Sequence, residues 1–194
     1  MRLFVAFELP AAVRRAVGER IGEQRERLPA ARWVRPENLH LTLLFLGEVP
    51  ADGRPALEAA LAPPCAASPR LTLRLAGAGT YPPSRPARVA WLGVEVEEGV
   101  DVLRALQATL AAAVVRVLDV ELDRRPYTPH LTLARPQQPW RRDACEAFGA
   151  SFGGPFGEPF RADAAHLVAS ESGRAAAGAP RYTKLAGFPL EAAA

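Results

Sequence analysis

The tetrapeptide His-Leu-Thr-Leu occurs twice in this chain of 194 residues, at positions 40–43 and again at positions 130–133. The two copies are offset by 90 residues, which is close to half of the chain. The same order of expected strands and helices surrounds each copy, and such internal similarity indicates a duplicated structural unit. We therefore predict a single bilobal domain over residues 1–194, with an internal repeat of about 1–80 and 88–194.

Hydrophobic periodicity predicts the same succession of elements in both halves, because alternating apolar residues favour strands and apolar residues three or four apart favour helices. The first half is predicted to contain strand 2–9, helix 10–28, extended segment 32–34, strand 39–46, helix 52–62 and strand 70–75. The second half is predicted to contain strand 88–96, helix 100–117, extended segment 120–122, strand 128–135, helix 140–148, strand 158–169, a loop at 172–180 and a last strand at 181–188.

Strands that are joined by only a few residues pair antiparallel. The sequence therefore predicts an α+β fold, in which two lobes of antiparallel sheet with outer helices are related by a pseudo-twofold axis around a central groove. That symmetry would bring the two His-Leu-Thr-Leu strands close to each other at the centre of the molecule.

Residues i and i+2 of a strand project from the same face. His40 and Thr42 therefore share one face of their strand, while the leucines of the motif point into the core. The same holds for His130 and Thr132. Two such strands would present two imidazoles and two hydroxyls to one cleft.

Two facing histidines suit acid–base chemistry, because a free imidazole has a pKa of about 6.5 and one ring can be charged while the other is neutral. Opening a cyclic phosphate requires both forms. A neutral histidine takes a proton from the attacking water, and a protonated one donates to the departing ribose oxygen. The hydroxyls of Thr42 and Thr132 can bond the non-bridging oxygens, where negative charge develops. This chemistry needs no metal.

Three residues near the motifs have positions that allow more than one role. Arg135 follows His130 by five residues, so a flat strand would point it to the opposite face, as a strand-end arginine in solvent. It would reach the phosphate only if the strand bulges or ends there. Phe45 has the same spacing from His40, and we expect it in the core rather than under a base. Tyr127 is a candidate for stacking on a base.

Other classes of function find little support. The third histidine, His166, has no partner motif and is expected to be structural, and neither Cys65 nor Cys145 lies in a C-x-x-C pair. The sequence lacks H-E-x-x-H, phosphate-binding G-x-x-x-x-G-K-[ST] and dinucleotide-binding G-x-G-x-x-G patterns. We therefore expect no metal and no cofactor.

Composition adds only weak constraints. The net charge is +3, and Lys184 is the single lysine among the basic residues. Arginine suits bidentate phosphate contacts, although codon bias explains the same composition. No apolar run approaches the roughly 20 residues that span a bilayer, and Glu8 and Pro10 interrupt the first apolar segment. We expect a cytoplasmic protein that does not enter the membrane.

Several segments resemble one family over nearly the whole chain. They are Arg-Leu-Phe-Val-Ala at 2–6 with Leu-Pro at 9–10, Arg-Trp-Val at 32–34, Pro-Glu-Asn-Leu-His-Leu-Thr-Leu at 36–43, Phe-Leu-Gly at 45–47, Pro-His-Leu-Thr-Leu-Ala-Arg at 129–135 and the closing segment 182–190. The chain is similar to the 2H phosphoesterase superfamily, which is named for two H-x-[ST]-x motifs. Within it, the chain most resembles the bacterial and archaeal RNA 2′,3′-cyclic phosphodiesterases, historically called 2′-5′ RNA ligases.

This resemblance implies the LigT-like fold of two lobes around a groove, and hydrolysis of an RNA-terminal 2′,3′-cyclic phosphate to a 2′-phosphate. It implies that His40 is the general acid for the 3′ oxygen and that His130 is the general base for water. Thr42, Thr132 and Arg135 would bind the phosphate.

The expected partners are RNA ends or nucleotides that carry a cyclic phosphate, with tRNA fragments among the candidates, and the expected state is a monomer. Two alternatives stay open. The same residues would catalyse the reverse reaction, which joins a cyclic end to a 5′-hydroxyl through a 2′-5′ linkage. A non-catalytic module that only binds RNA ends would keep Arg135 and the threonines functional, but it would make His40 dispensable.

Overall fold

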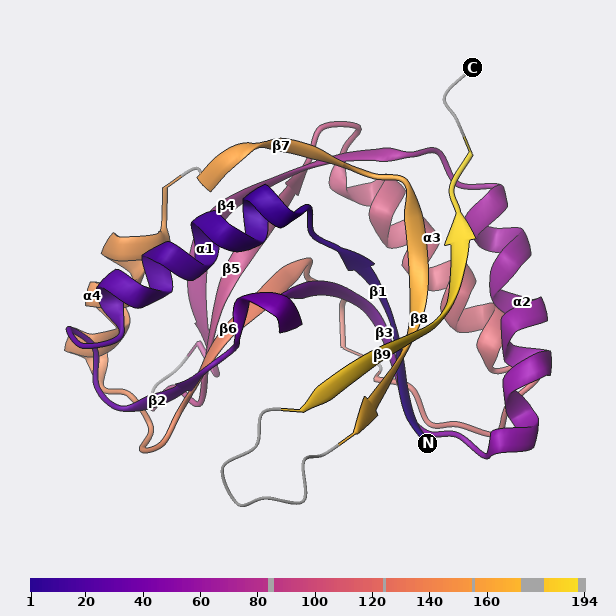
Figure 1. The fold of residues 1–194 in the computed structure, drawn as a ribbon, viewed down its shortest axis with the longest axis horizontal. Coiled ribbons are helices and arrows are strands. Elements are labelled where there is room, and N and C mark those ends of the chain that lie inside the picture. The colour runs from indigo at the N-terminus through magenta and orange to yellow at the C-terminus, as the bar shows by residue number, and fades with distance from the viewer. Residues whose placement is uncertain (84–85, 124, 155, 172–179, 192–194) are drawn as a thin grey trace.

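The computed structural model describes residues 1–83, 86–123, 125–154, 156–171 and 180–191. Their strands form two antiparallel sheets, and helices flank both of them (Figure 1). The first sheet has the order β3-β1-β8-β9, with strands His40–Glu48, Arg2–Glu8, Ala164–Glu171 and Arg181–Pro189. The second sheet has the order β2-β6-β5-β4-β7, with strands Ala31–Trp33, His130–Pro136, Val89–Val96, Leu71–Tyr81 and Phe156–Ala162. The predicted α+β class is confirmed.

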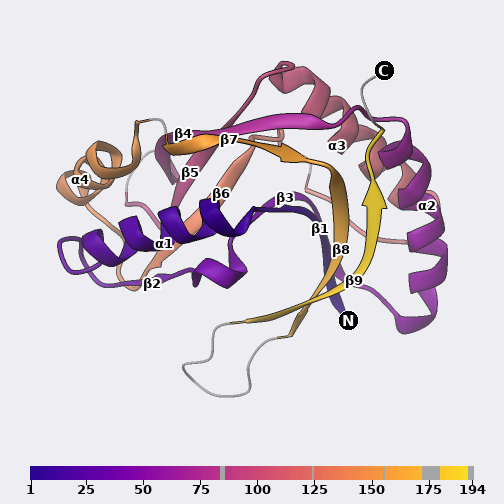
Figure 2. The ribbon, with the colours of Figure 1, turned by 45° about the horizontal axis from the view of Figure 1, so that its top comes forward.

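The two sheets do not coincide with the two halves of the sequence. Strand β4 belongs to the first half of the chain but pairs with β5 and β7 in the second sheet. Strands β8 and β9 belong to the second half but extend the first sheet from β1. Each sheet is therefore built from both halves, and the chain passes repeatedly from one sheet to the other (Figure 2).

The helices cover the outer faces of the sheets. Helices α2 and α3 pack against each other beside the first sheet, and α1 and α4 lie beside the second (Figures 1 and 2). They span Ala11–Gln24 (α1), Arg54–Ala66 (α2), Val100–Val114 (α3) and Arg142–Phe152 (α4), with short 3₁₀ turns at Pro36–Asn38 and Ala51–Gly53. Each helix buries one apolar stripe, such as Leu103, Leu106, Leu110 and Val114 of α3. Burial of such stripes, rather than helix propensity, stabilises helices of this length.

Some boundaries differ from the prediction. Helix α1 ends at Gln24 rather than at residue 28, and residues 120–122 form no strand. Helix α2 continues through Pro63 and Pro64 to Ala66, although proline usually ends a helix. The single strand expected at 158–169 is two strands, β7 and β8, because the chain leaves the second sheet and enters the first at this point. Of the loop expected at 172–180, all but Pro180 lies outside the described residues.

Candidate functional site

The two His-Leu-Thr-Leu motifs lie on two strands that belong to different sheets and contact each other. Strand β3 is the edge strand of the first sheet, and it contacts β6 of the second sheet. The hydroxyl of Tyr127, just before β6, donates a hydrogen bond of 2.9 Å to the backbone oxygen of Thr42 on β3. The fold therefore brings the two motifs together, as the repeat predicted.

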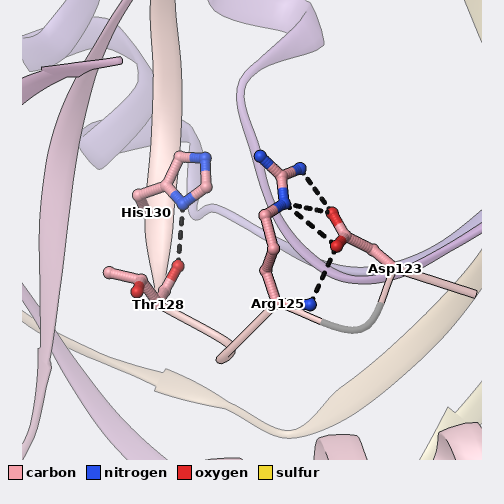
Figure 3. A network of polar contacts seen from close by, with 4 residues as sticks. All are labelled: Asp123, Arg125, Thr128 and His130. Carbon is pink, nitrogen blue, oxygen red and sulfur yellow. Dashed lines mark hydrogen bonds and ion pairs between the residues drawn. The ribbon is translucent and has the colours of Figure 1, made fainter. Parts of the chain in front are cut away.

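Each catalytic candidate is held by the same backbone contact. His40 Nδ1 lies 2.7 Å from the carbonyl oxygen of Asn38, and His130 Nδ1 lies 2.7 Å from that of Thr128 (Figure 3). A carbonyl oxygen can only accept, so Nδ1 carries the hydrogen in both rings. In the neutral ring, Nε2 is then the basic nitrogen. Two equivalent contacts thus give both imidazoles the same tautomer.

Each motif contains a β-bulge at its last residue. In β3, Thr42 pairs with Ala6 and Leu44 pairs with Val5, so Leu43 is the extra residue. In β6, Thr132 and Ala134 pair with neighbouring residues of β5 in the same way, so Leu133 is the extra residue. A bulge shifts the alternation of side chains by one position.

The bulges change where two predicted residues lie. Arg135 now shares the face of His130 and Thr132, which removes the objection drawn from a flat strand. Phe45 shares the face of His40 and Thr42, and 60% of its surface is exposed. The expectation that Phe45 belongs to the core was therefore wrong, because the bulge reverses its direction.

Aromatic rings surround His40. Its imidazole centroid lies 4.7 Å from the ring of Phe4 and 5.3 Å from that of Tyr182, which it meets edge-on. Phe45 lies 6.1 Å from Phe4 and extends the same cluster. Burial among these rings lowers the pKa of His40, and the hydrogen bond to the Asn38 carbonyl partly opposes this effect.

The charge of His130 also lowers the pKa of His40. The two imidazoles are therefore close enough to interact electrostatically, although they belong to different sheets. A positive charge on His130 therefore disfavours protonation of His40.

His130 has different neighbours. Its ring centroid lies 6.0 Å from that of Trp91 on β5. Figure 3 shows that the exposed Arg125 projects to the same side of the chain as His130, and that it forms an ion pair with Asp123. This pair holds the pKa of Asp123 down at about 2, so Asp123 stays ionised and partly neutralises Arg125.

Arg135 of β6 interacts electrostatically with a residue of the first sheet. Burial raises the pKa of Tyr182, whereas the positive charges of Arg135 and Arg2 lower it. Tyr182 is in turn in edge contact with His40. Arg135 therefore lies near the aromatic rings around His40, although it belongs to the second sheet.

Tyr127 does not have the surroundings expected of a platform for a base. Its ring packs against the main hydrophobic core, and its hydroxyl is bonded to Thr42. Burial raises its pKa. These contacts favour a structural role for Tyr127 between the two motifs over the predicted stacking on a base.

The remaining candidates lie outside the motifs. His166 Nε2 lies 3.7 Å from Glu8 Oε2, and Lys184 Nζ lies 2.8 Å from the same oxygen. Burial lowers the pKa of His166. Burial also raises the pKa of the Cys65 thiol to about 11, which makes this cysteine unreactive.

The described part of the chain offers neither a metal-binding cluster nor a membrane-spanning helix. Its His, Cys, Asp and Glu side chains form no group of three or more that could hold a metal ion. No helix in the described ranges is long and apolar enough to cross a membrane.

The sequence patterns did not identify Phe4 and Tyr182 as neighbours of His40, or Trp91 as a neighbour of His130. Phe4, Ala6 and Glu8 alternate with the core residues of β1, and the charge of Glu8 marked their face as the one away from the helices. That pattern could have identified Phe4. Tyr182 reaches His40 only because β9 joins the sheet of the other half, and no local pattern indicates that pairing.

Comparisons with known proteins agree on one family. The model described as "2′-5′ RNA ligase superfamily" matches residues 10–174. An RNA 2′,3′-cyclic phosphodiesterase of Geobacillus stearothermophilus is 35% identical over 153 residues, which cover 76% of this chain and 47% of that protein. The chain thus spans about half the length of that relative. A protein of the same description from Thermus thermophilus is 37% identical over 156 residues, covering 77% of this chain and 75% of the relative.

A solved structure gives the same result. The crystal structure of E. coli LigT complexed with 3′-AMP superposes with a TM-score of 0.71 and 31% sequence identity, and the match covers 97% of each chain.

Proposed function

The chain belongs to the 2′-5′ RNA ligase superfamily, and we propose that it is an enzyme that opens the 2′,3′-cyclic phosphate at an RNA end to give a 2′-phosphomonoester. Its relatives in Geobacillus and Thermus are described as RNA 2′,3′-cyclic phosphodiesterases. The observation that carries the proposal is the pairing of His40 and His130, which have the same tautomer, lie on two strands that contact each other between the sheets, and interact electrostatically.

The reaction assigns different tasks to the two histidines. Neutral His130 accepts a proton at Nε2 from water as the water oxygen attacks phosphorus. Protonated His40 donates its Nε2 proton to the 3′ oxygen as the bond between phosphorus and that oxygen breaks. The product keeps the phosphate on the 2′ oxygen and regains a 3′-hydroxyl.

Thr42, Thr132 and Arg135 bind the non-bridging oxygens in this proposal. All three lie on the same faces as the histidines, the two threonines at i+2 and Arg135 beyond the bulge. The strands fix the backbone positions of these residues before the substrate arrives. Donors placed in this way would stabilise the charge that develops on the phosphate oxygens in the transition state.

Phe45 is the residue that we propose as the platform for the terminal base. Its ring is exposed on the face of His40, and a solvent-exposed aromatic beside a phosphate site suits stacking. The adenine nucleotide in the E. coli LigT complex is a ligand of this class. The acceptance of other bases would follow from the shape of the platform, since every base offers a flat face.

The reverse reaction uses the same residues. A 5′-hydroxyl in place of water would give a 2′-5′ linkage, with His130 again as the base and His40 again as the acid. We expect hydrolysis to dominate when water is in excess over RNA ends. We also expect a monomer that acts in the cytoplasm, with tRNA fragments among its substrates.

Identification of the product tests the proposal. The protein is incubated with each 2′,3′-cyclic nucleotide, with and without EDTA, and the product is identified by ³¹P NMR. We expect the 2′-phosphate in both conditions. A 3′-phosphate would reverse the assignment of the leaving oxygen, and activity that EDTA abolishes would contradict a metal-free mechanism.

A binding measurement separates the enzyme from a module that only binds RNA ends. We expect His40→Ala to bind a nucleoside 2′-phosphate in calorimetry while its turnover of the cyclic nucleotide is lost. Wild-type protein that binds cyclic nucleotides without converting them would instead identify a binding module.

A further inference from the structure

Trp91 occupies the sheet face that carries His130. Its neighbours in β5, Ala90 and Leu92, are completely buried in the core, so the alternation of the strand directs Trp91 to the opposite face. Trp91 pairs with Thr132, the threonine of the second motif. Its ring centroid lies 6.0 Å from that of His130. The indole is therefore next to the proposed general base.

The backbone beneath Trp91 is shaped for this ring. A Cβ atom at Gly79 would lie 2.2 Å from Cζ2 of Trp91, so only glycine allows the indole to lie against β4. The indole nitrogen is buried, and no partner for it exists among the residues of the described chain. An unpaired buried donor lowers stability, so packing alone does not explain why tryptophan stands here.

The first sheet has no aromatic ring at the equivalent position. There, the residue that pairs with the motif threonine is Ala6, which pairs with Thr42. The aromatic rings near His40 come from Phe4, Phe45 and Tyr182 instead. The ring of Trp91 is therefore particular to the side of the site where the nucleophile is activated.

An aromatic residue, Tyr81, and a cationic residue, Arg125, lie beyond Trp91 on the same side of the sheet. Tyr81 lies two residues beyond Gly79 on β4, and 44% of its surface is exposed. The guanidinium of Arg125 lies 5.9 Å from the centre of the Tyr81 ring. Aromatic faces together with arginine suit a nucleotide strand better than they suit a single water molecule.

We propose that Trp91 is the platform for the base of an acceptor nucleoside, whose 5′-hydroxyl takes the place of water at His130. This inference rests on the proposed function. The nucleophile attacks phosphorus roughly in line with the departing 3′ oxygen, so it arrives on the side of His130. A water molecule needs no platform there, whereas a nucleoside does.

In the joining reaction, His130 and His40 account for both proton transfers. The 5′-hydroxyl gives its proton to Nε2 of His130, and its oxygen forms a bond to phosphorus. The bond between phosphorus and the 3′ oxygen breaks, and that oxygen takes a proton from His40. The product is a 2′-5′ phosphodiester with a free 3′-hydroxyl. In the opposite direction, the same subsite holds the nucleoside that leaves when a 2′-5′ linkage is cleaved.

Two reactions on the same protein test the inference. Cleavage of a 2′-5′-linked diadenosine monophosphate needs the acceptor subsite, whereas hydrolysis of 2′,3′-cyclic AMP does not. We expect Trp91→Ala to lower kcat/KM for the dinucleotide by roughly 5- to 150-fold, which is the range for the loss of one stacked base. The kcat/KM for the cyclic nucleotide should change by less than about threefold, and Trp91→Phe should retain most of both activities.

Gly79→Ala is the matched variant, because it keeps the indole and forces it out of place. We expect it to lower cleavage of the dinucleotide while hydrolysis of the cyclic nucleotide is retained. Circular dichroism and thermal unfolding confirm that each variant is folded.

Equal losses of both activities, or no loss of dinucleotide cleavage in Trp91→Ala, would overturn the inference. So would a wild-type protein that hydrolyses the cyclic nucleotide but does not cleave the 2′-5′ linkage. A wild-type protein that does not hydrolyse the cyclic nucleotide would overturn the proposed function itself.

Discussion

His40 and His130 occupy equivalent positions in two copies of one device, but their surroundings differ. Each ring is bonded through Nδ1 to the carbonyl two residues before it, and each motif contains a bulge at its last residue. His40 is packed against Phe4 and Tyr182, which lower its pKa by burial. His130 lies beside Trp91, and the exposed Arg125 projects to the same side of the chain (Figure 3). The two copies of the motif therefore hold the imidazoles by the same backbone contact, whereas the neighbouring side chains of the two rings differ.

The exchange of strands provides these neighbours. Tyr182 belongs to β9 of the second half, yet it contacts the histidine of the first half because β8 and β9 extend the first sheet. A symmetric dimer of two identical halves would give both histidines the same surroundings. Two halves within one chain can differ at matched positions, and residues 45 and 135 are phenylalanine and arginine.

The largest expected effect comes from the histidines themselves. His40→Ala and His130→Ala should each lower turnover of a 2′,3′-cyclic nucleotide by roughly 10²–10⁴-fold, the usual contribution of general acid–base catalysis. A substrate with sulfur in place of the 3′ oxygen distinguishes their roles, because a thiolate leaves without being protonated. This substrate should restore turnover to His40→Ala but not to His130→Ala.

Initial rates of the two variants on the two substrates measure this difference. Restoration of His130→Ala instead would exchange the two roles, and restoration of both variants would refute separate roles for the two rings.

Arg135 should have the next largest effect. Arg135→Ala removes a cation from the phosphate oxygens, and we expect a decrease in kcat of roughly 10²-fold, comparable to the loss of one donor from an oxyanion site. Arg135→Lys keeps the charge but cannot form bidentate hydrogen bonds to the phosphate, so it should recover only part of the rate. Steady-state kinetics with a cyclic nucleotide measure both variants. An unchanged kcat in Arg135→Ala would mean that the guanidinium does not touch the phosphate.

Phe45, at the matched position in the first motif, should act on binding rather than on rate. Phe45→Ala should raise KM for a cyclic nucleotide by roughly tenfold, because one base loses its stacking partner. Phe45→Trp keeps a flat ring and serves as the control, with a KM near that of the wild type. If Phe45→Ala lowered kcat and left KM unchanged, the division of tasks between positions 45 and 135 would be wrong.

The smallest expected effect is a change in the titration of His40. We expect NMR titration to give the His40 imidazole a pKa below 6.5 in the free protein, because burial disfavours its charged form. Tyr182→Ala opens one side of the ring, so it should move this pKa upward. A value at or above 6.5 for His40 in the wild-type protein would contradict the buried surroundings.

The same shift predicts a dependence of stability on pH. The unfolded chain binds the proton more tightly than folded His40 does, so the free energy of unfolding decreases as the pH falls from 6.5 to the lowered pKa, and below it this contribution is constant. Burial of His166 acts in the same direction. His40→Ala should therefore weaken this dependence without abolishing it.

Local patterns predicted the elements and the faces of the two motifs, because a period of two residues is a property of one strand. The exchange of β4, β8 and β9 could not be predicted in this way, since it depends on which sheet completes which hydrophobic face. The sequence does contain an indication of the bulges, in two consecutive apolar residues at the end of each motif. Leu43 is followed by Leu44, and Leu133 is followed by Ala134, so both motifs break their alternation where the extra residue lies.

The contact between the two sheets also affects how the protein meets its ligand. His40 lies in one sheet and His130 in the other, and the sheets cannot separate without breaking the hydrogen bond between Tyr127 and Thr42 and the packing of β3 against β6. These contacts form when the chain folds, and they set the separation of the imidazoles. The conformational entropy of assembling the site is then lost during folding, so the proposed RNA substrate would use little of its binding free energy to bring the two histidines together.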